Sequence, residues 1–342
     1  MEIKKIIEIL TNGVDLTEDE TFKIFNRIFL GELTNAQIAS ILTGLKAKGE
    51  TVAEMVGAAK AMRSKAAGAV IPDGIQFELV DTCGTGGDYK NTFNVSTCAA
   101  IIAAGAGVKI AKHGNYAVSS KSGSADVLQE LGVNIQADIN VVIRSIEEAN
   151  IGFLFAPRFH GAMKFAAPVR KELGIKTIFN ILGPLTNPFN AKNQVIGVYS
   201  GEIGKKIAGA IKLLGLKRGY VVYGKDGIDE VSLSDKTTVY EINDEIEISY
   251  EIDPEELGFK LCGIEELQAF SAAENAAIIK DIVSGKKSPK SDMAILNAGF
   301  AIKASGKTDD LNESICLARQ SIESGNAEKT LKEFIKISNG KM

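Results

Sequence analysis

Tryptophan is absent from the 342 residues, histidine occurs only twice and cysteine only four times. The cysteines lie far apart and form no CxxC pair, and only the two histidines could join them as soft ligands. This spacing argues against both a zinc site and a disulfide framework. We therefore expect a reduced, cytoplasmic protein.

A targeting signal, a membrane span and an excess of positive charge are also missing. The first ten residues mix Glu with Lys and lack the cleavage site of a signal peptide. The most apolar stretch, residues 95–111, contains Ser96, Thr97 and Lys109 and is shorter than the roughly 20 apolar residues of a membrane helix. With 39 Lys and Arg against 43 Asp and Glu, the net charge of −4 argues against a nucleic-acid partner. The 45% hydrophobic and 24% charged residues are typical of a globular protein.

The first 70 residues carry the signals of four helices. Apolar residues between positions 3 and 10 are spaced to share one helical face. Capping boxes, in which a Thr is followed three residues later by Glu or Gln, occur at residues 17–20, 34–37 and 51–54. These patterns predict a small helical unit.

Strands and helices alternate after residue 77, which predicts a largely parallel sheet with helices on its faces. The expected helices cover residues 95–105, 125–131, 203–214, 272–282 and 293–304. The expected strands cover residues 77–80, 108–111, 151–155, 194–199 and 219–223, and residues 237–252 predict a hairpin or an edge strand.

A glycine-rich segment, Asp81-Thr-Cys-Gly-Thr-Gly-Gly-Asp88, follows the first predicted strand. Glycines there let backbone N–H groups approach an anion closely. No Gly-Lys-Ser/Thr follows, and Tyr89 occupies the place of a third glycine, so the segment is neither a Walker loop nor a dinucleotide fingerprint. Phosphate binding and an ordinary tight turn both remain open.

Two further polar segments also allow two interpretations. Residues 91–97, Asn-Thr-Phe-Asn-Val-Ser-Thr, lead into the helix expected at 95–105, where they could cap the helix or bind an anion at its N-terminus. Lys112-His-Gly-Asn115 and the Ser-rich residues 119–124 follow the next strand, at the edge where open α/β sheets bind ligands. A flexible surface loop would have the same composition.

Asp229 and Glu230 follow the strand expected at 219–223, and adjacent carboxylates suit Mg²⁺. An isolated pair of this kind is more often a solvated acidic turn. Arg170 lies in Pro168-Val-Arg-Lys-Glu-Leu-Gly174, where its guanidinium could grip a carboxylate or could simply face solvent.

Taken in this order, the segments resemble the anthranilate phosphoribosyltransferase family over essentially the whole chain. The resemblance rests on residues 84–88, 94–97, 112–115, 170–188 and 229–230. It implies an α/β fold of the nucleoside phosphorylase/phosphoribosyltransferase type and a homodimer. A helical domain at 1–70, with a contribution from about 165–185, would pack on an α/β domain at 71–342 with a mostly parallel sheet.

The reaction implied by the resemblance is transfer of the ribose phosphate of phosphoribosyl pyrophosphate (PRPP) to the amine of anthranilate in tryptophan biosynthesis. Pyrophosphate is released and Mg²⁺ is required. No catalytic acid or base is expected, because the departing oxygens need electrostatic stabilisation and the neutral aromatic amine needs positioning.

The resemblance also implies the roles of individual residues. The PRPP site would comprise Gly84, Gly87, Asp88, Thr92, Asn94, Ser96, Thr97, Lys112, Ser120 and Ser124. The magnesium ligands would be Ser96, Asp229 and Glu230. The anthranilate contacts would be Gly84, Asn115 and Arg170, with Arg170 pairing with the substrate carboxylate. The chain departs from the family pattern on the acceptor side, at Tyr116, Phe159, Gly161 and Phe165.

Two alternatives share this architecture. A pyrimidine nucleoside phosphorylase would also carry a glycine loop, but Asp229, Glu230 and Arg170 favour PRPP chemistry. A non-enzymatic, nucleic-acid-binding relative would need a basic surface, which the net charge does not support.

Overall fold

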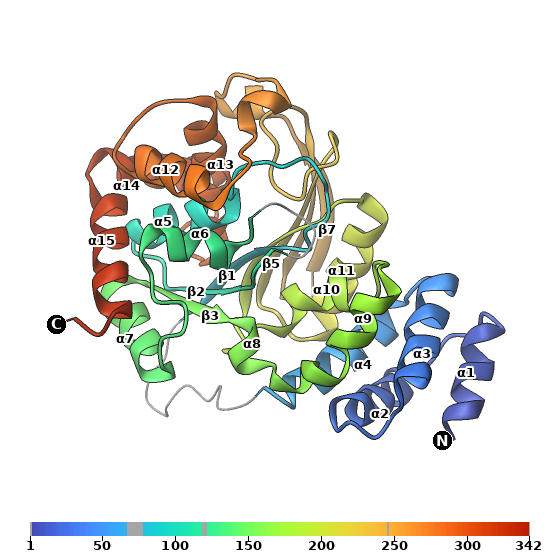
Figure 1. Cartoon of the computed structure of the whole chain (residues 1–342). Coiled ribbons are helices and arrows are strands. Elements are labelled where there is room, and N and C mark those ends of the chain that lie inside the picture. Colours follow the sequence, from blue (N-terminus) through green and yellow to red (C-terminus); the bar gives the residue numbers. More distant parts are fainter. Residues whose placement is uncertain (1, 67–77, 118–121, 245, 342) are drawn as a thin grey trace.

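A computed structural model describes residues 2–66, 78–117, 122–244 and 246–341 of the chain (Figure 1). Its centre is a seven-stranded sheet of order β3-β2-β1-β4-β5-β6-β7. The five strands from β3 to β5 are parallel, whereas β5, β6 and β7 pair antiparallel. The predicted mostly parallel sheet and its terminal hairpin are therefore confirmed. The strands are β1 (Val80–Gly84), β2 (Ile110–Gly114), β3 (Ile151–Phe155), β4 (Asn193–Gly197), β5 (Arg218–Gly224), β6 (Thr237–Asn243) and β7 (Ile246–Ile252).

The four predicted N-terminal helices are present and pack at one end of the molecule (Figure 1). In each of the three predicted capping boxes, the Thr hydroxyl accepts from a backbone N–H and the Glu or Gln side chain accepts from the cap residue. The helices are α1 (Ile3–Thr11), α2 (Glu18–Phe29), α3 (Asn35–Lys48) and α4 (Val52–Arg63). The domain boundary expected near residue 70 lies outside the described residues.

A later segment of the chain joins this helical group. It contains α8 (Ala156–Phe159), α9 (Ala167–Leu173) and α10 (Phe179–Leu182), with 3₁₀ turns at Gly161–Phe165 and Gly183–Thr186. Val169, Ile178 and Phe179 are buried in the same hydrophobic cluster as Phe25 and Leu42 of the N-terminal helices. The segment thus packs with the N-terminal helices and then returns to the sheet.

The remaining helices cover the sheet, and most of them enclose a second hydrophobic cluster, whereas the helix at Gly201–Leu213 joins the cluster of the N-terminal helices. They are α5 (Val95–Gly105), α6 (Ser124–Leu131), α7 (Ile139–Ala149), α11 (Gly201–Leu213), α12 (Ala272–Val283), α13 (Pro289–Ala304), α14 (Leu311–Glu323) and α15 (Asn326–Ser338). Two more 3₁₀ turns lie at Pro254–Leu257 and Ile264–Leu267. None of the helices in the described part of the chain has the length and apolar character needed to cross a membrane.

Three local predictions differ from the structure. The first strand, expected at 77–80, covers Val80–Gly84, so the first four residues of the glycine-rich segment belong to the strand. The second strand begins at Ile110 and not at Val108, because the Val108 N–H donates to Ala103 O at 3.1 Å and keeps Val108 in the turn that ends α5. Helix α7 was not predicted, although Asp138 caps it by accepting from Asn140 N.

Candidate active site

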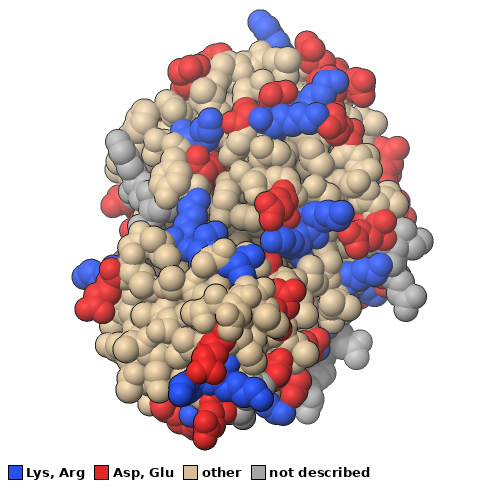
Figure 2. Space-filling model, turned by 90° about the vertical axis from the view of Figure 1, so that its right-hand side faces the viewer, with Lys and Arg blue, Asp and Glu red and all other residues tan. Residues whose placement is uncertain are grey.

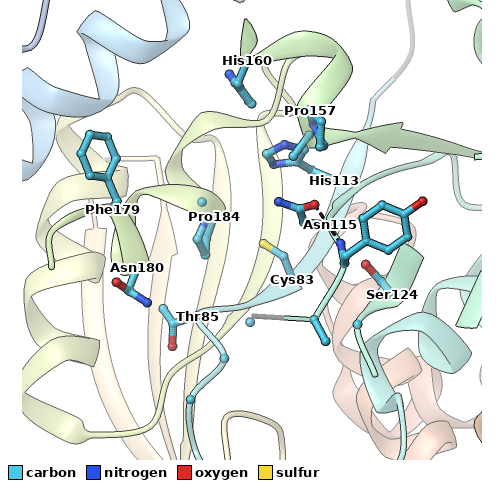
Figure 3. Close-up of a pocket in the computed structure, with 18 of the residues that line it drawn as sticks. Cys83, Thr85, His113, Asn115, Ser124, Pro157, His160, Phe179, Asn180 and Pro184 are labelled. Atoms are coloured by element: carbon cyan, nitrogen blue, oxygen red, sulfur yellow. Dashed lines mark hydrogen bonds between the residues drawn. The ribbon is translucent and has the colours of Figure 1, made fainter. Parts of the chain in front are cut away.

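A cleft of about 660 Å³ lies at the carboxyl ends of β1, β2 and β3, between the sheet and the segment that packs with the N-terminal helices. Figure 3 shows His160, His113 and Pro157 towards one rim of the cleft, Thr85 and Asn180 towards the other, and Cys83 between them. Segments distant in sequence therefore meet at one edge of the sheet. The predicted site residues that line the cleft are Gly84, Gly87, Asn94, Ser96, Lys112, Asn115, Ser124, Arg170, Asp229 and Glu230.

The carboxylate of Asp229 lies directly against the glycine loop. Its Oδ2 accepts a hydrogen bond from Gly86 N at 2.7 Å. A Cβ on Gly84 would lie 2.5 Å from the same oxygen, and a Cβ on Gly197 would lie 1.6 Å from the Asp229 carbonyl oxygen. Glycine at the ends of β1 and β4 is thus required by the close approach of Asp229.

Glu230 lies at the N-terminus of α5. Its Oε1 accepts from Ser96 N at 3.2 Å, and the buried Lys112 Nζ donates to Ser96 Oγ at 3.3 Å and to Thr82 O at 2.6 Å. Asn94 is the cap residue but makes no side-chain cap bond. Capping by Asn94, one of the two interpretations of residues 91–97, is therefore wrong, and Glu230 instead accepts a first-turn N–H.

Burial sets the protonation of the acidic pair. It raises the pKa of Asp229 to about 7, and the nearby Asp88 adds to the rise. It also raises the pKa of Glu230 well above its usual range, assisted by Asp229 and opposed by the Lys112 ammonium. The two side chains are partly buried against the cleft wall, so the alternative of a solvated acidic turn is wrong.

The oxygen atoms gathered here fit a hard divalent cation. Asp88 Oδ2 is buried and has no hydrogen-bond partner among the described residues, and Asp88 shares a small cavity with Asp229 and Glu230. Within the described ranges, no three His, Cys, Asp or Glu residues form a complete metal cage. Mg²⁺ takes one or two protein carboxylates and completes its shell with water and substrate phosphates, so Asp229 and Glu230 are of the right chemistry for its protein ligands.

Two histidines form a neutral wall of the cleft. The rings of His113 and His160 meet edge to face with centroids 5.2 Å apart. Burial lowers the pKa of His113 to about 3, with a contribution from His160, and lowers that of His160 to about 4. Both imidazoles are therefore uncharged near neutral pH, which suits contact with an aromatic ring.

Arg170 provides a cationic group in the same cleft. Its guanidinium stacks 5.3 Å from the centre of the Phe179 ring. Across residues 2–66, 78–117, 122–244 and 246–341, no carboxylate lies within ion-pair distance of this group. Burial lowers its pKa. An unpaired, partly desolvated guanidinium is a strong partner for an incoming carboxylate, which favours carboxylate binding over the solvent-facing alternative.

The other predicted site residues take different places. Asp88 and Thr92 line the small cavity of about 120 Å³ beside the main cleft. Thr97 is fully buried and donates to Asn94 Oδ1 at 2.6 Å, so it supports Asn94 from behind. Asn115 Oδ1 accepts from Tyr116 N, the dashed line in Figure 3. Ser120 lies outside the described residues.

The four departures from the family pattern are spatially separate. Tyr116 and Gly161 line the cleft, with the Tyr116 ring 5.1 Å from that of Phe155. Phe159 is buried against Phe189, and Phe165 packs on Gly31 of the helical group. The acceptor side of the cleft is thus changed by Tyr116 and Gly161.

Several cleft residues were missing from the predicted site. They include Cys83, Thr85, Pro157, His160, Phe179 and Asn180. Thr85, Phe179 and Asn180 lie within residues 84–88 and 170–188, on which the resemblance rests. Their position in these segments was the only feature of the sequence that could have indicated them. His160 follows α8, which begins where β3 ends beside β2, so its pairing with His113 depends on the fold and not on a local motif.

Comparison with known proteins agrees with this architecture. Residues 4–66 match the family described as "Glycosyl transferase family, helical bundle domain", and residues 76–328 match "Glycosyl transferase family, a/b domain". The fold and the cleft are therefore those of a glycosyl transferase. The anthranilate phosphoribosyltransferase of Geotalea uraniireducens is 46% identical over 98% of this chain and 99% of its own length. The chain belongs to the anthranilate phosphoribosyltransferase family.

Solved structures show the same similarity. The anthranilate phosphoribosyltransferase of Thermus thermophilus superposes with a TM-score of 0.91 at 40% identity, covering 98% of this chain and 99% of that one. The Saccharomyces cerevisiae enzyme in complex with PRPP and Mg gives 0.90 at 30% identity, and the same enzyme with 4-fluoroanthranilate gives 0.89 at 29%. Each covers 99% of this chain and 98% of the solved chain. The resemblance, the fold class and the phosphoribosyltransferase class are confirmed.

Proposed function

We propose that the cleft binds PRPP with Mg²⁺ at the glycine loop and anthranilate beside Arg170, and transfers the ribose phosphate to the anthranilate amine. The observation that carries the proposal is that the glycine loop with its acidic pair and the Arg170 guanidinium line one cleft. Asp229 touches the glycine loop through Gly86 N at 2.7 Å, and the unpaired Arg170 lines the same space. A cleft of about 660 Å³ is within the usual range for small-molecule sites and has room for both substrates.

Asp229, Glu230 and the Ser96 hydroxyl would hold the magnesium ion. Their donors are all oxygen, and the raised pKa values of the two carboxyls show how unfavourable their negative charges are without a counter-charge. When bound, Mg²⁺ neutralises negative charge on the leaving pyrophosphate. These three ligands are a proposal for this chain. The yeast relative solved in complex with PRPP and Mg supports a magnesium ion in the site.

The chain's own residues bind and orient the two reactants. Backbone N–H groups of the glycine loop and the Lys112 ammonium face the pyrophosphate, and Arg170 holds the acceptor carboxylate. The amine nitrogen forms a bond to the anomeric carbon as the bond to the pyrophosphate oxygen breaks, and the amine gives one proton to the departing pyrophosphate. The neutral histidines exclude water and contact the aromatic ring, so positioning replaces a catalytic base.

The test is a fluorescence assay with the purified protein, anthranilate, PRPP and Mg²⁺. Because the chain has no tryptophan, its own emission interferes little with that of anthranilate. We expect the anthranilate signal to fall only when all three components are present. An unchanged signal at saturating PRPP contradicts the proposed function, and phosphorolysis of thymidine or uridine under the same conditions would favour the phosphorylase alternative.

A homodimer and a cytoplasmic location are also proposed, on the resemblance and on the lack of paired cysteines respectively. A nucleic-acid-binding role has no comparable support. On the face in Figure 2, Lys and Arg are interspersed with Asp and Glu and do not form one broad basic area.

A further inference from the structure

Lys176 connects two parts of the cleft that lie far apart in sequence. It is located between α9 and α10, in the segment that packs with the N-terminal helices. Its Nζ donates to the carbonyl oxygen of Gly87 in the glycine loop at 2.8 Å. The same nitrogen lies 3.7 Å from the ring centre of Tyr199 and 4.9 Å from that of Tyr89. One ammonium group thus contacts the glycine loop, the Tyr89 ring directly after it and the Tyr199 ring two residues beyond the end of β4.

The backbone is shaped to accept this contact. Gly87 has φ +83°, and a Cβ there would lie 2.8 Å from Lys176 Nζ. Tyr89 has the unusual positive φ of 57°, which a residue other than glycine adopts only when its surroundings hold it there. Closer to β1, the loop is held by Thr85 N donating to Gly197 O and by Gly86 N donating to Asp229. At Gly87, the loop is held by the hydrogen bond from Lys176.

The segment that carries Lys176 is firmly packed. Ile178 and Phe179 are buried in the helical cluster, and Thr177 N donates to Asn180 Oδ1 at 3.0 Å. Asn180 and Arg170 line the acceptor side of the cleft. Lys176 therefore joins the wall that carries Arg170 to the loop that faces PRPP.

The electrostatic environment favours a bridging role over an ion pair. Burial and the nearby Lys46 lower the pKa of Lys176, and the attraction of Asp229 and Asp88 only partly opposes this shift. No carboxylate of the described residues lies within ion-pair distance of Lys176. Its close partners are a carbonyl oxygen and two aromatic faces, which hold a cation without neutralising it.

We propose that Lys176 is a positioning residue that fastens the glycine loop to the Arg170-bearing segment and thereby orders the loop for PRPP. The inference rests on the proposed function. Because the contact holds the loop and not the anthranilate contacts, its loss affects the PRPP half of the site. Arginine can keep both the donor and the contact with the rings, whereas methionine keeps only the length of the side chain.

The test compares Lys176→Met and Lys176→Arg with wild type in the anthranilate fluorescence assay, with Lys171→Met as control. Lys171 is exposed on α9, so its replacement makes the same charge change on the same segment. We expect Lys176→Met to raise the KM for PRPP about tenfold, equal to ~1.4 kcal/mol. The KM for anthranilate should change less than about twofold. Lys176→Arg should recover most of the loss, and Lys171→Met should behave as wild type.

An unchanged KM for PRPP in an active Lys176→Met variant overturns the inference, as does an increase confined to anthranilate. An inactive wild type contradicts the proposed function instead, so the two failures are distinct. A double-mutant cycle gives a second readout. Tyr199→Leu alone should raise the KM for PRPP about two- to fivefold through the lost cation–π contact, and should add little in the Lys176→Met background. If the effects of the two substitutions on the KM for PRPP add, the role given to the Tyr199 ring is wrong.

Discussion

Replacing Asp229 by asparagine should abolish turnover and yet stabilise the protein in the absence of metal. Burial and Asp88 raise the pKa of Asp229 from 3.8 to about 7 in the folded state. A raised carboxyl pKa means that the folded state binds the proton more tightly than the unfolded state. The contribution of Asp229 to stability therefore falls as the pH rises from about 4 to about 7, and the full cost of its charge is present above pH 7.

The size of the effect follows from the pKa shift. At ~1.4 kcal/mol per pKa unit, the ionised Asp229 costs at most about 4 kcal/mol at pH 8. Asparagine removes the charge but weakens the hydrogen bond from Gly86 N, which leaves a gain of about 2 to 4 kcal/mol. A chain of this length has an unfolding entropy of about 0.7 kcal/mol per kelvin. The melting temperature should therefore rise by about 3 to 6 °C.

The assay is thermal unfolding of wild type and Asp229→Asn in EDTA at pH 8 and at pH 5. The advantage of the variant should shrink to less than half at pH 5, because the wild-type carboxyl is then protonated in the folded state. Adding Mg²⁺ with PRPP should stabilise the wild type only. The control is Glu130→Gln, which removes an exposed carboxylate on α6. A variant less stable than wild type at pH 8, or a gain independent of pH, would refute the reasoning.

Three further substitutions test the cleft and the framework behind it. Arg170→Ala should raise the KM for anthranilate by a factor of about 30, the equivalent of ~2 kcal/mol for a lost carboxylate contact; steady-state kinetics that show the increase for PRPP alone would contradict this role. Gly197→Ala should lower kcat/KM more than about a hundredfold, because the added Cβ would lie 1.6 Å from the Asp229 carbonyl oxygen and displace the acidic pair; activity near wild type would show that this approach is not needed. Asn187→Ala should lower the free energy of unfolding in urea by about 2 to 4 kcal/mol, since the buried amide donates to Asp81 Oδ2 and Ala111 O, both at 2.8 Å; a loss below about 1 kcal/mol would mean that these bonds contribute little.

The helices and strands were predictable where local signals are strong. The capping boxes that begin α2, α3 and α4 each span four residues, so each helix start is encoded locally. Strand β3 was predicted at its observed bounds because Ile151–Phe155 is a continuous apolar run that is buried along its whole length. Helix α7 was not predicted, although Asp138 at its start is a local capping signal.

The site was predictable only in part, because its contacts join residues far apart in sequence. The motif segments identified Gly84, Asp229 and Arg170. The parallel sheet brings Gly84 and Asp229 to the cleft, and Arg170 reaches it from the segment that packs with the N-terminal helices. The need for glycine at position 197 could not be seen, since it arises from the Asp229 backbone across the β4 end. Lys176 was likewise hidden inside a quoted motif, because its partners Gly87 and Tyr199 are placed beside it only by the fold.

The most direct test of the central claim is a crystal structure of the protein soaked with PRPP, Mg²⁺ and an anthranilate analogue. The pyrophosphate should lie over the glycine loop, with Mg²⁺ in contact with Asp229 or Glu230. The analogue carboxylate should face Arg170 in the same cleft. Ligand density that leaves the acidic pair without a metal ion, or that places the two substrates in separate cavities, would contradict the account.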